Sequence, residues 1–128
     1  MSLRFYNTMT RRLDEFQPIE EGHARMYTCG PTVYNFAHIG NFRAYIFEDL
    51  LRRYLKFRGF QVTQVMNLTD VDDKTIRGAN EKKVLLSQYT KTYVDAFFED
   101  LKTLNVEPAE YYPAATDHIP DMINLIHR

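Results

Sequence analysis

The side chains best suited to chemistry in this 128-residue sequence gather in one short stretch, residues 29–41. Cys29 offers a thiol, and a thiolate is a soft metal ligand. His38 could stabilise charge that builds on a phosphoryl group during transfer, and Gly40 would let a base or ribose lie close to the backbone. The stretch therefore favours a nucleotide site. A purely structural alternative makes His38 the polar start of a helix, Gly40 a packing glycine and Asn41 a cap.

A second polar stretch, residues 67–74, follows a predicted strand and carries three aspartates. Carboxylates at Asp70, Asp72 and Asp73 could hold a magnesium ion. Alternatively, Asp72 or Asp73 caps a short helix over residues 74–80, where a carboxylate suits the positive end of the helix dipole. We favour the capping interpretation for Asp72 and Asp73.

The elements that must position these residues form a strand–helix–strand unit. Residues 24–29 read as a strand that Gly30 and Pro31 end, and apolar residues recur at helical spacing from Phe42 to the stop signal at Gly59. Residues 60–66 then form an alternating, β-branched strand. This order predicts a parallel pair with a right-handed crossover. Residues 29–41 would lie where a strand ends and a helix begins, the place where open α/β sheets bind ligands.

The flanking segments are less informative. We expect a short strand over residues 4–6, followed by an irregular arm. Beyond the core we expect a helix over residues 87–104, a loop over 106–116 that contains proline and tyrosine, and a last helix from about residue 117 that has no terminator. The predicted organisation is a βαβ core over about 22–80 and a helical segment over about 85–128, together part of a longer catalytic domain.

Composition excludes several classes of protein. With 16 Lys+Arg against 17 Asp+Glu, the net charge of −1 excludes a strongly basic module that binds nucleic acid by bulk electrostatics alone. A single cysteine excludes an intrachain disulfide. The sequence also lacks a leader pattern and an apolar run long enough to span a bilayer. We therefore expect a cytoplasmic protein with no membrane partner.

Three segments together are similar to a known family. Residues Met26–Tyr34, His38–Asn41 and Asn67–Lys74 resemble the N-terminal catalytic region of the cysteinyl-tRNA synthetases, a class I aminoacyl-tRNA synthetase family. Residues 6–18 and 77–80 fit the same family, in order and without a large gap. The resemblance implies an α/β fold with a Rossmann-like (HUP-type) parallel sheet and flanking helices, of which this chain would be the N-terminal half. It also implies activation of cysteine by ATP to cysteinyl-adenylate and transfer to tRNA(Cys).

The resemblance implies roles for individual residues. His38 and Asn41 hold catalytic positions in the family's ATP-binding "HIGH" signature, although Asn41 replaces its second histidine and can donate hydrogen bonds without carrying a positive charge. The implied ATP-binding residues are Pro31, Thr32, His38, Gly40 and Asn41. The implied residues that bind the substrate cysteine are Cys29, Gly30 and Thr69. Mg²⁺ would accompany ATP as part of the substrate.

Cys29 matches the family's first zinc-ligand position. A Zn²⁺ ion with one open position can take the substrate's sulfur as a thiolate, which serine cannot offer, so coordination separates two substrates of nearly the same shape. From the residues alone, a lone cysteine is more often a small buried hydrophobe. Because the sequence has no second cysteine, we expect the remaining zinc ligands to lie beyond residue 128.

Several alternatives stay open. The family's lysine-containing second signature is absent from the sequence, so we expect a truncated portion that does not aminoacylate tRNA alone. A related cysteine-activating ligase that acts on a small amine, a nucleotidyltransferase of the same superfamily, and a non-catalytic interaction module are the other candidates. The cationic cluster Arg52, Arg53, Lys56 and Arg58 reads as a solvated helix face, with a weak contact to the tRNA backbone as the alternative.

Overall fold

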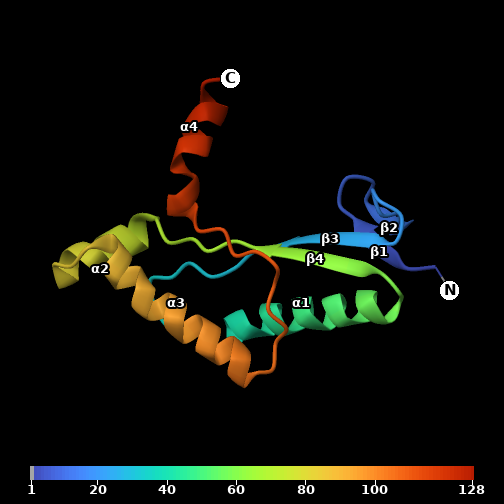
Figure 1. Ribbon diagram of the computed structural model, residues 1–128, viewed down its shortest axis with the longest axis horizontal. Helices are drawn as coiled ribbons and strands as arrows, with labels where there is room; N and C mark the ends of the chain where they lie inside the picture. Colours follow the sequence, from blue (N-terminus) through green and yellow to red (C-terminus); the bar gives the residue numbers. More distant parts are fainter. Residues whose placement is uncertain (1) are drawn as a thin grey trace.

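A parallel pair of strands and one long helix form the centre of the protein, in a computed structural model that describes residues 2–128 (Figure 1). Strand β3 (His23–Thr28) pairs with strand β4 (Gln61–Met66), and helix α1 (Ile39–Phe57) connects them. The predicted strand–helix–strand unit is confirmed. The helix begins three residues earlier than the apolar period indicated, because His38 rather than Asn41 occupies the N-cap position.

An antiparallel hairpin precedes the core. It pairs β1 (Arg4–Asn7) with β2 (Arg12–Glu15), so the predicted irregular arm is wrong at the second strand. The sequence Arg-Leu-Asp-Glu carries no β-branched residue and little apolar character, so nothing local indicates a strand. Phe16, just after β2, packs edge-on against Phe60 and thereby ties the hairpin to the core.

The main apolar cluster lies where α1 crosses the end of β4. It joins α1 to helix α3 (Leu86–Thr103), with the Tyr45 and Phe97 ring centroids 5.3 Å apart. Its buried members are Phe42, Tyr45, Met66, Leu68, Phe97 and Leu101. This cluster holds the N-terminal half of α1 against the end of the parallel pair, where the candidate site lies.

Helix α2 (Asp73–Lys82) packs against α3 and lies at the left end of the molecule in Figure 1. The Asp72 carboxylate accepts hydrogen bonds from the backbone N–H groups of Lys74 and Thr75, both at 2.9 Å. The capping interpretation is therefore confirmed at Asp72, which begins α2.

The predicted loop that follows α3 runs along the free edge of β4. Isolated parallel bridges join Val65 to Tyr111 and Leu68 to Ala114. Backbone hydrogen bonds accompany them, including Met66 N–H to the Tyr111 carbonyl at 3.0 Å. The segment thus extends the parallel pair without forming a regular strand.

The predicted solvated face of α1 is wrong at Arg52, which is only 4% exposed. Its guanidinium donates to Gln64 at 3.2 Å and pairs with the carboxylates of Glu107 and Glu110. Lys56 also pairs with Glu107. We refer to Arg52, Lys56, Gln64, Glu107 and Glu110 as the Arg52 cluster; it fastens the segment after α3 to α1 and β4.

The chain ends in a short 3₁₀ turn (Ala115–His118) and helix α4 (Ile119–Ile126), which projects away from the body in Figure 1. No residue of α4 is buried. Among residues 2–128, none of the helices combines the length and apolar character that a bilayer span requires.

Candidate active site

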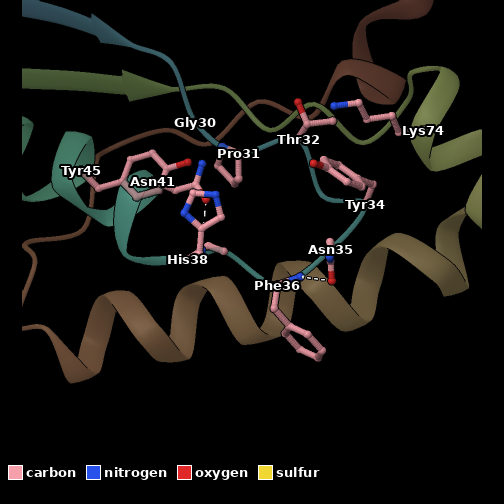
Figure 2. Close-up of a pocket in the computed structure, with 11 residues that line it drawn as sticks. Gly30, Pro31, Thr32, Tyr34, Asn35, Phe36, His38, Asn41, Tyr45 and Lys74 are labelled. Carbon is pink, nitrogen blue, oxygen red and sulfur yellow. Dashed lines mark hydrogen bonds between the residues drawn. The ribbon is translucent and has the colours of Figure 1, made fainter.

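A cavity of about 340 Å³ opens between the end of β3 and the start of α1 (Figure 2). It lies at the predicted position, beyond the carboxyl end of a strand and at a helix N-terminus. Its lining residues are Gly30, Pro31, Thr32, Tyr34, Asn35, Phe36, Ala37, His38, Asn41, Tyr45 and Lys74. The connection between β3 and α1 therefore supplies most of the wall.

His38 and Asn41 cap the helix reciprocally. The His38 Nδ1 atom accepts from the Gly40 N–H at 3.0 Å, and the Asn41 Oδ1 atom accepts from the His38 N–H at 3.0 Å. Because Nδ1 acts as an acceptor, a neutral His38 ring carries its proton on Nε2. Neither His38 Nε2 nor Asn41 Nδ2 has a hydrogen-bond partner among the described residues. The structural interpretation of these residues as caps is correct, and it leaves two donors at the cavity.

Two glycines shape the site without serving the same purpose. A Cβ at Gly40 would lie 2.9 Å from His38 Cε1, so this glycine makes room for the capping imidazole. A Cβ at Gly30 would overlap the Asn67 carbonyl oxygen, so only glycine lets the end of β3 pass the end of β4 this closely. Gly30 lines the cavity, and Gly40 stands behind His38.

The outer wall of the cavity is held from behind by α3. The Tyr89 hydroxyl donates to the Tyr34 carbonyl at 2.7 Å, and the Tyr93 ring meets the Phe36 ring edge-on at 5.2 Å. Gly78 of α2 lies against Tyr89, where a Cβ would overlap the phenol. The sequence analysis missed Tyr89 and Tyr93; the glycine inside α2 was the one local signal of a close helix contact.

Tyr45 adds a neutral hydroxyl to the cavity. Burial, with smaller contributions from the neighbouring Glu48 and Cys29 side chains, raises the pKa of Tyr45 to about 12. Burial also raises the pKa of Glu48, against a smaller lowering by the Thr28 hydroxyl, and its Oε2 atom is buried with no hydrogen-bond partner. Tyr45 therefore keeps its proton near neutral pH and acts as a hydrogen-bond donor.

The predicted cysteine-binding residues lie around one edge of this cavity, and only Gly30 lines it. Cys29 is exposed at the end of β3, which contradicts its interpretation as a small buried hydrophobe. Thr69 pairs through its backbone with the cavity loop: its N–H donates to the Pro31 carbonyl at 3.0 Å, and its carbonyl accepts from Val33 at 3.1 Å. Thr69 thus holds the start of the cavity loop in place through its backbone, next to Cys29 and Gly30.

Metal ligands are sparse in the described part of the chain. Residues 2–128 contain no group of three or more His, Cys, Asp and Glu side chains arranged to hold a metal. The Asp70 carboxylate accepts from the backbone N–H and the hydroxyl of Thr116, and Asp72 caps α2. Both carboxylates therefore make hydrogen bonds that support the local backbone.

Comparison with known proteins gives a consistent result. The family described as tRNA synthetases class I (C) catalytic domain matches residues 15–128. The chain is 68% identical over 124 residues to the cysteine--tRNA ligase of Protochlamydia amoebophila, which covers 97% of the chain and 26% of that protein. Its identity to the cysteine--tRNA ligase of Brachyspira hyodysenteriae is 61% over 122 residues, covering 95% of the chain and 26% of the relative.

A more distant relative, the cysteine--tRNA ligase of Pyrococcus horikoshii, is 49% identical over 128 residues, covering the whole chain and 27% of that protein. The chain therefore spans about a quarter of the length of the curated relatives that it matches. The similarity extends from the hairpin through the cavity loop to α4.

Proposed function

The chain belongs to the family of tRNA synthetases class I (C) catalytic domains, and from this premise we propose that it forms the N-terminal part of the catalytic domain of a cysteine--tRNA ligase. In this proposal β3, β4 and the segment beside them begin a Rossmann-like sheet. The protein would activate cysteine with ATP and transfer it to tRNA(Cys). The identity to cysteine--tRNA ligases over nearly the whole chain supports the choice of amino acid.

The observation that carries the proposal is the pair of unpartnered donors at the start of α1. His38 Nε2 and Asn41 Nδ2 adjoin a cavity at the positive end of the helix dipole, where a phosphate group is favoured. In cysteine activation, a substrate carboxylate oxygen bonds to the α-phosphorus of ATP while the bond to the bridging oxygen breaks and pyrophosphate leaves. Donors fixed beforehand can stabilise the negative charge that builds on the phosphoryl oxygens.

Pro31 and Thr32 would contact ATP at the opposite wall, and Gly40 would act by holding His38 in its capping position. Tyr45 would donate a hydrogen bond from a hydroxyl that stays neutral. The tyrosines of α3 would keep this wall in place, through the bond from Tyr89 to the Tyr34 carbonyl. Such fixed geometry lowers the reorganisation that the reacting groups require.

Cys29 would serve at the cysteine end of the site. Its exposed thiol fits one position of a tetrahedral zinc centre, but the described residues do not supply a complete ligand set. We therefore propose Cys29 as a single ligand, with Gly30 and Thr69 next to it on the side of the substrate cysteine. No step of the proposed reaction is assigned to the metal.

Cysteine-dependent exchange of pyrophosphate into ATP tests the proposal, because it requires activation but no tRNA. We expect exchange by the protein translated from the complete reading frame and none by the 128-residue chain alone. Transfer of the activated cysteine to tRNA(Cys) rather than to a small amine would separate the two ligase classes. Absence of cysteine-dependent exchange in the complete protein would contradict the proposal and favour an interaction module.

A further inference from the structure

A second cavity, of about 470 Å³, continues from the first one along helix α2. The two cavities share Tyr34, Asn35 and Lys74. The rest of the second cavity is lined by Arg77, Gly78, Glu81, Tyr89 and Tyr93. A ligand that fills the first cavity can therefore extend into the second without leaving the protein surface.

Two cations on α2 face this second cavity. Lys74 and Arg77 stand one helical turn apart, and neither forms an ion pair with any residue in the described part of the chain. The Lys74 ammonium lies 4.6 Å from the centre of the Tyr34 ring. Figure 2 shows the two side chains next to each other. One carboxylate, Glu81, lies on the same face, so the cavity keeps an excess of positive charge.

The cations of α1 provide the contrast. Arg52, Arg53 and Lys56 are all paired with carboxylates and hold the fold together. Lys74 and Arg77 stabilise nothing comparable in the described residues, so their charges remain available to a ligand.

The floor of the second cavity is aromatic and fixed. Tyr89 is bonded to the Tyr34 carbonyl and meets Tyr93 edge-on at 5.2 Å. The Lys82 ammonium lies over both of these rings and 3.3 Å from the Tyr93 hydroxyl. Cations beside a rigid aromatic surface are the features with which proteins hold phosphate esters and nucleic acid ends.

We propose that the second cavity is a phosphate-binding subsite that continues the proposed nucleotide site. Lys74 serves both cavities, and Arg77 provides the second positive charge. The ligand is a phosphate ester, either the polyphosphate of ATP or the phosphodiesters at the 3′ end of the tRNA. This inference rests on the proposed function, because it takes the first cavity as the place where the α-phosphate of ATP reacts.

Substitution of Arg77 tests the subsite in the protein translated from the complete reading frame. Arg77→Gln removes one charge, and Lys102→Gln is the matched control, because Lys102 is an exposed cation in the last turn of α3 that lines neither cavity. Titration calorimetry with ATP, inorganic pyrophosphate and a short single-stranded RNA gives the dissociation constants over a series of salt concentrations. Such titrations need no turnover, so they test the subsite independently of catalysis.

We expect Arg77→Gln to weaken binding of one phosphate ligand about three- to tenfold and to lower the salt dependence of that binding by about one charge. Arg77→Lys should restore part of the affinity. Weaker ATP and pyrophosphate binding would assign the subsite to the polyphosphate, whereas weaker RNA binding alone would assign it to tRNA. Unchanged affinities for all three ligands would overturn the proposal. Missing pyrophosphate exchange in the unsubstituted protein would instead contradict the proposed function.

Discussion

The two halves of α1 use polar side chains in opposite ways. At the N-terminal end, the His38 ring accepts from the Gly40 N–H and the Asn41 side chain accepts from the His38 N–H. These local bonds leave His38 Nε2 and Asn41 Nδ2 unpartnered at the cavity. Further along, Arg52 and Lys56 pair with carboxylates 51 to 58 residues away and keep little hydrogen-bonding capacity for a ligand. The N-terminal end of the helix carries the candidate catalytic groups, whereas the polar side chains further along make ion pairs that stabilise the fold.

This difference shows how one helix can present reactive groups without being loosely held. The capping bonds at His38 are local and exposed, so they contribute little to tertiary structure. The Arg52 cluster joins α1, β4 and the segment after α3 through side chains, in addition to the backbone hydrogen bonds between β4 and that segment. The position of the N-terminal end of α1 therefore depends on the apolar packing of Phe42 and Tyr45 and on the Arg52 cluster further along the helix, rather than on the capping bonds.

The largest expected effect is on the Arg52 cluster. Arg52→Met would remove the buried guanidinium from Glu107 and Glu110, whose side chains are 31% and 36% exposed. Loss of hydrogen bonds to a charged group of this kind costs about 1.5–3 kcal/mol. We expect the free energy of unfolding in urea to fall by that amount. Lys91→Met is the control, because its pair with Asp95 is exposed and contributes about 0.5 kcal/mol or less. Equal losses in the two variants would contradict the assigned difference between buried and exposed pairs.

At the other end of α1, His38→Asn separates capping from chemistry. Asparagine is one of the most favoured N-cap residues, so we expect the free energy of unfolding not to fall. Pyrophosphate exchange should fall about 10²- to 10³-fold, the usual consequence of losing one preorganised donor. His38→Ala should lose the same activity and about 1 kcal/mol of stability. If His38→Asn retained full exchange, the imidazole would be a cap and nothing more.

Local signals predicted the site end of α1 well. The β3–α1–β4 unit follows from two runs of strand residues and one helical period, and the cavity lies where that unit places it. A cap at Asp72 or Asp73 was predicted from position alone, and the structure shows it at Asp72. These features depend on residues within a few positions of one another, which is the range over which a sequence pattern determines backbone geometry.

The parts that the sequence analysis missed depend on distant partners. Nothing near Arg52 indicates that carboxylates arrive from beyond α3, so its charge was interpreted as solvated. Strand β2 is polar and exists because β1 pairs with it. The bond from Tyr89 to the Tyr34 carbonyl joins residues 55 positions apart, and it determines the cavity wall. Long-range pairing of this kind has no local sequence signature.

Gly78→Ala tests whether Tyr89 of α3 supports the cavity wall at Tyr34. The new Cβ would overlap the Tyr89 phenol, and overpacking of this kind costs about 1–3 kcal/mol. Displacement of Tyr89 also frees the Tyr34 carbonyl, so we expect the KM for ATP to rise more than kcat falls. Asn80→Ala, exposed on the same helix, is the control and should leave both quantities unchanged. A destabilised variant with normal KM for ATP would show that the wall does not need Tyr89.

The smallest effect is on the pH dependence of stability, to which Glu48 of α1 and Glu110 of the segment after α3 should contribute with opposite signs. Burial works to raise the pKa of Glu110, but hydrogen bonds from Gln64 and Arg52 outweigh it and hold the pKa below the ordinary 4.5. Glu110 therefore adds stability that is present above about pH 4.5 and is lost as the pH falls through its lower value in the folded protein. Glu48 is the reverse case: burial raises its pKa, so the folded protein holds that proton more tightly and loses stability as the pH rises above 4.5.

Unfolding free energies measured from about pH 3 to about pH 7 would separate the two carboxylates. Glu110→Gln should flatten the loss of stability in acid, because the unfolded chain no longer takes up a proton that the folded chain refuses. Glu48→Gln should raise stability at neutral pH, since the side chain then enters its buried position without a charge. The opposite signs follow from what each carboxylate meets: Glu110 meets the Arg52 guanidinium, whereas Glu48 is partly buried with one oxygen unpartnered. If both variants shifted the stability profile in the same direction, the assignment of ion pairing to Glu110 and of desolvation to Glu48 would be contradicted.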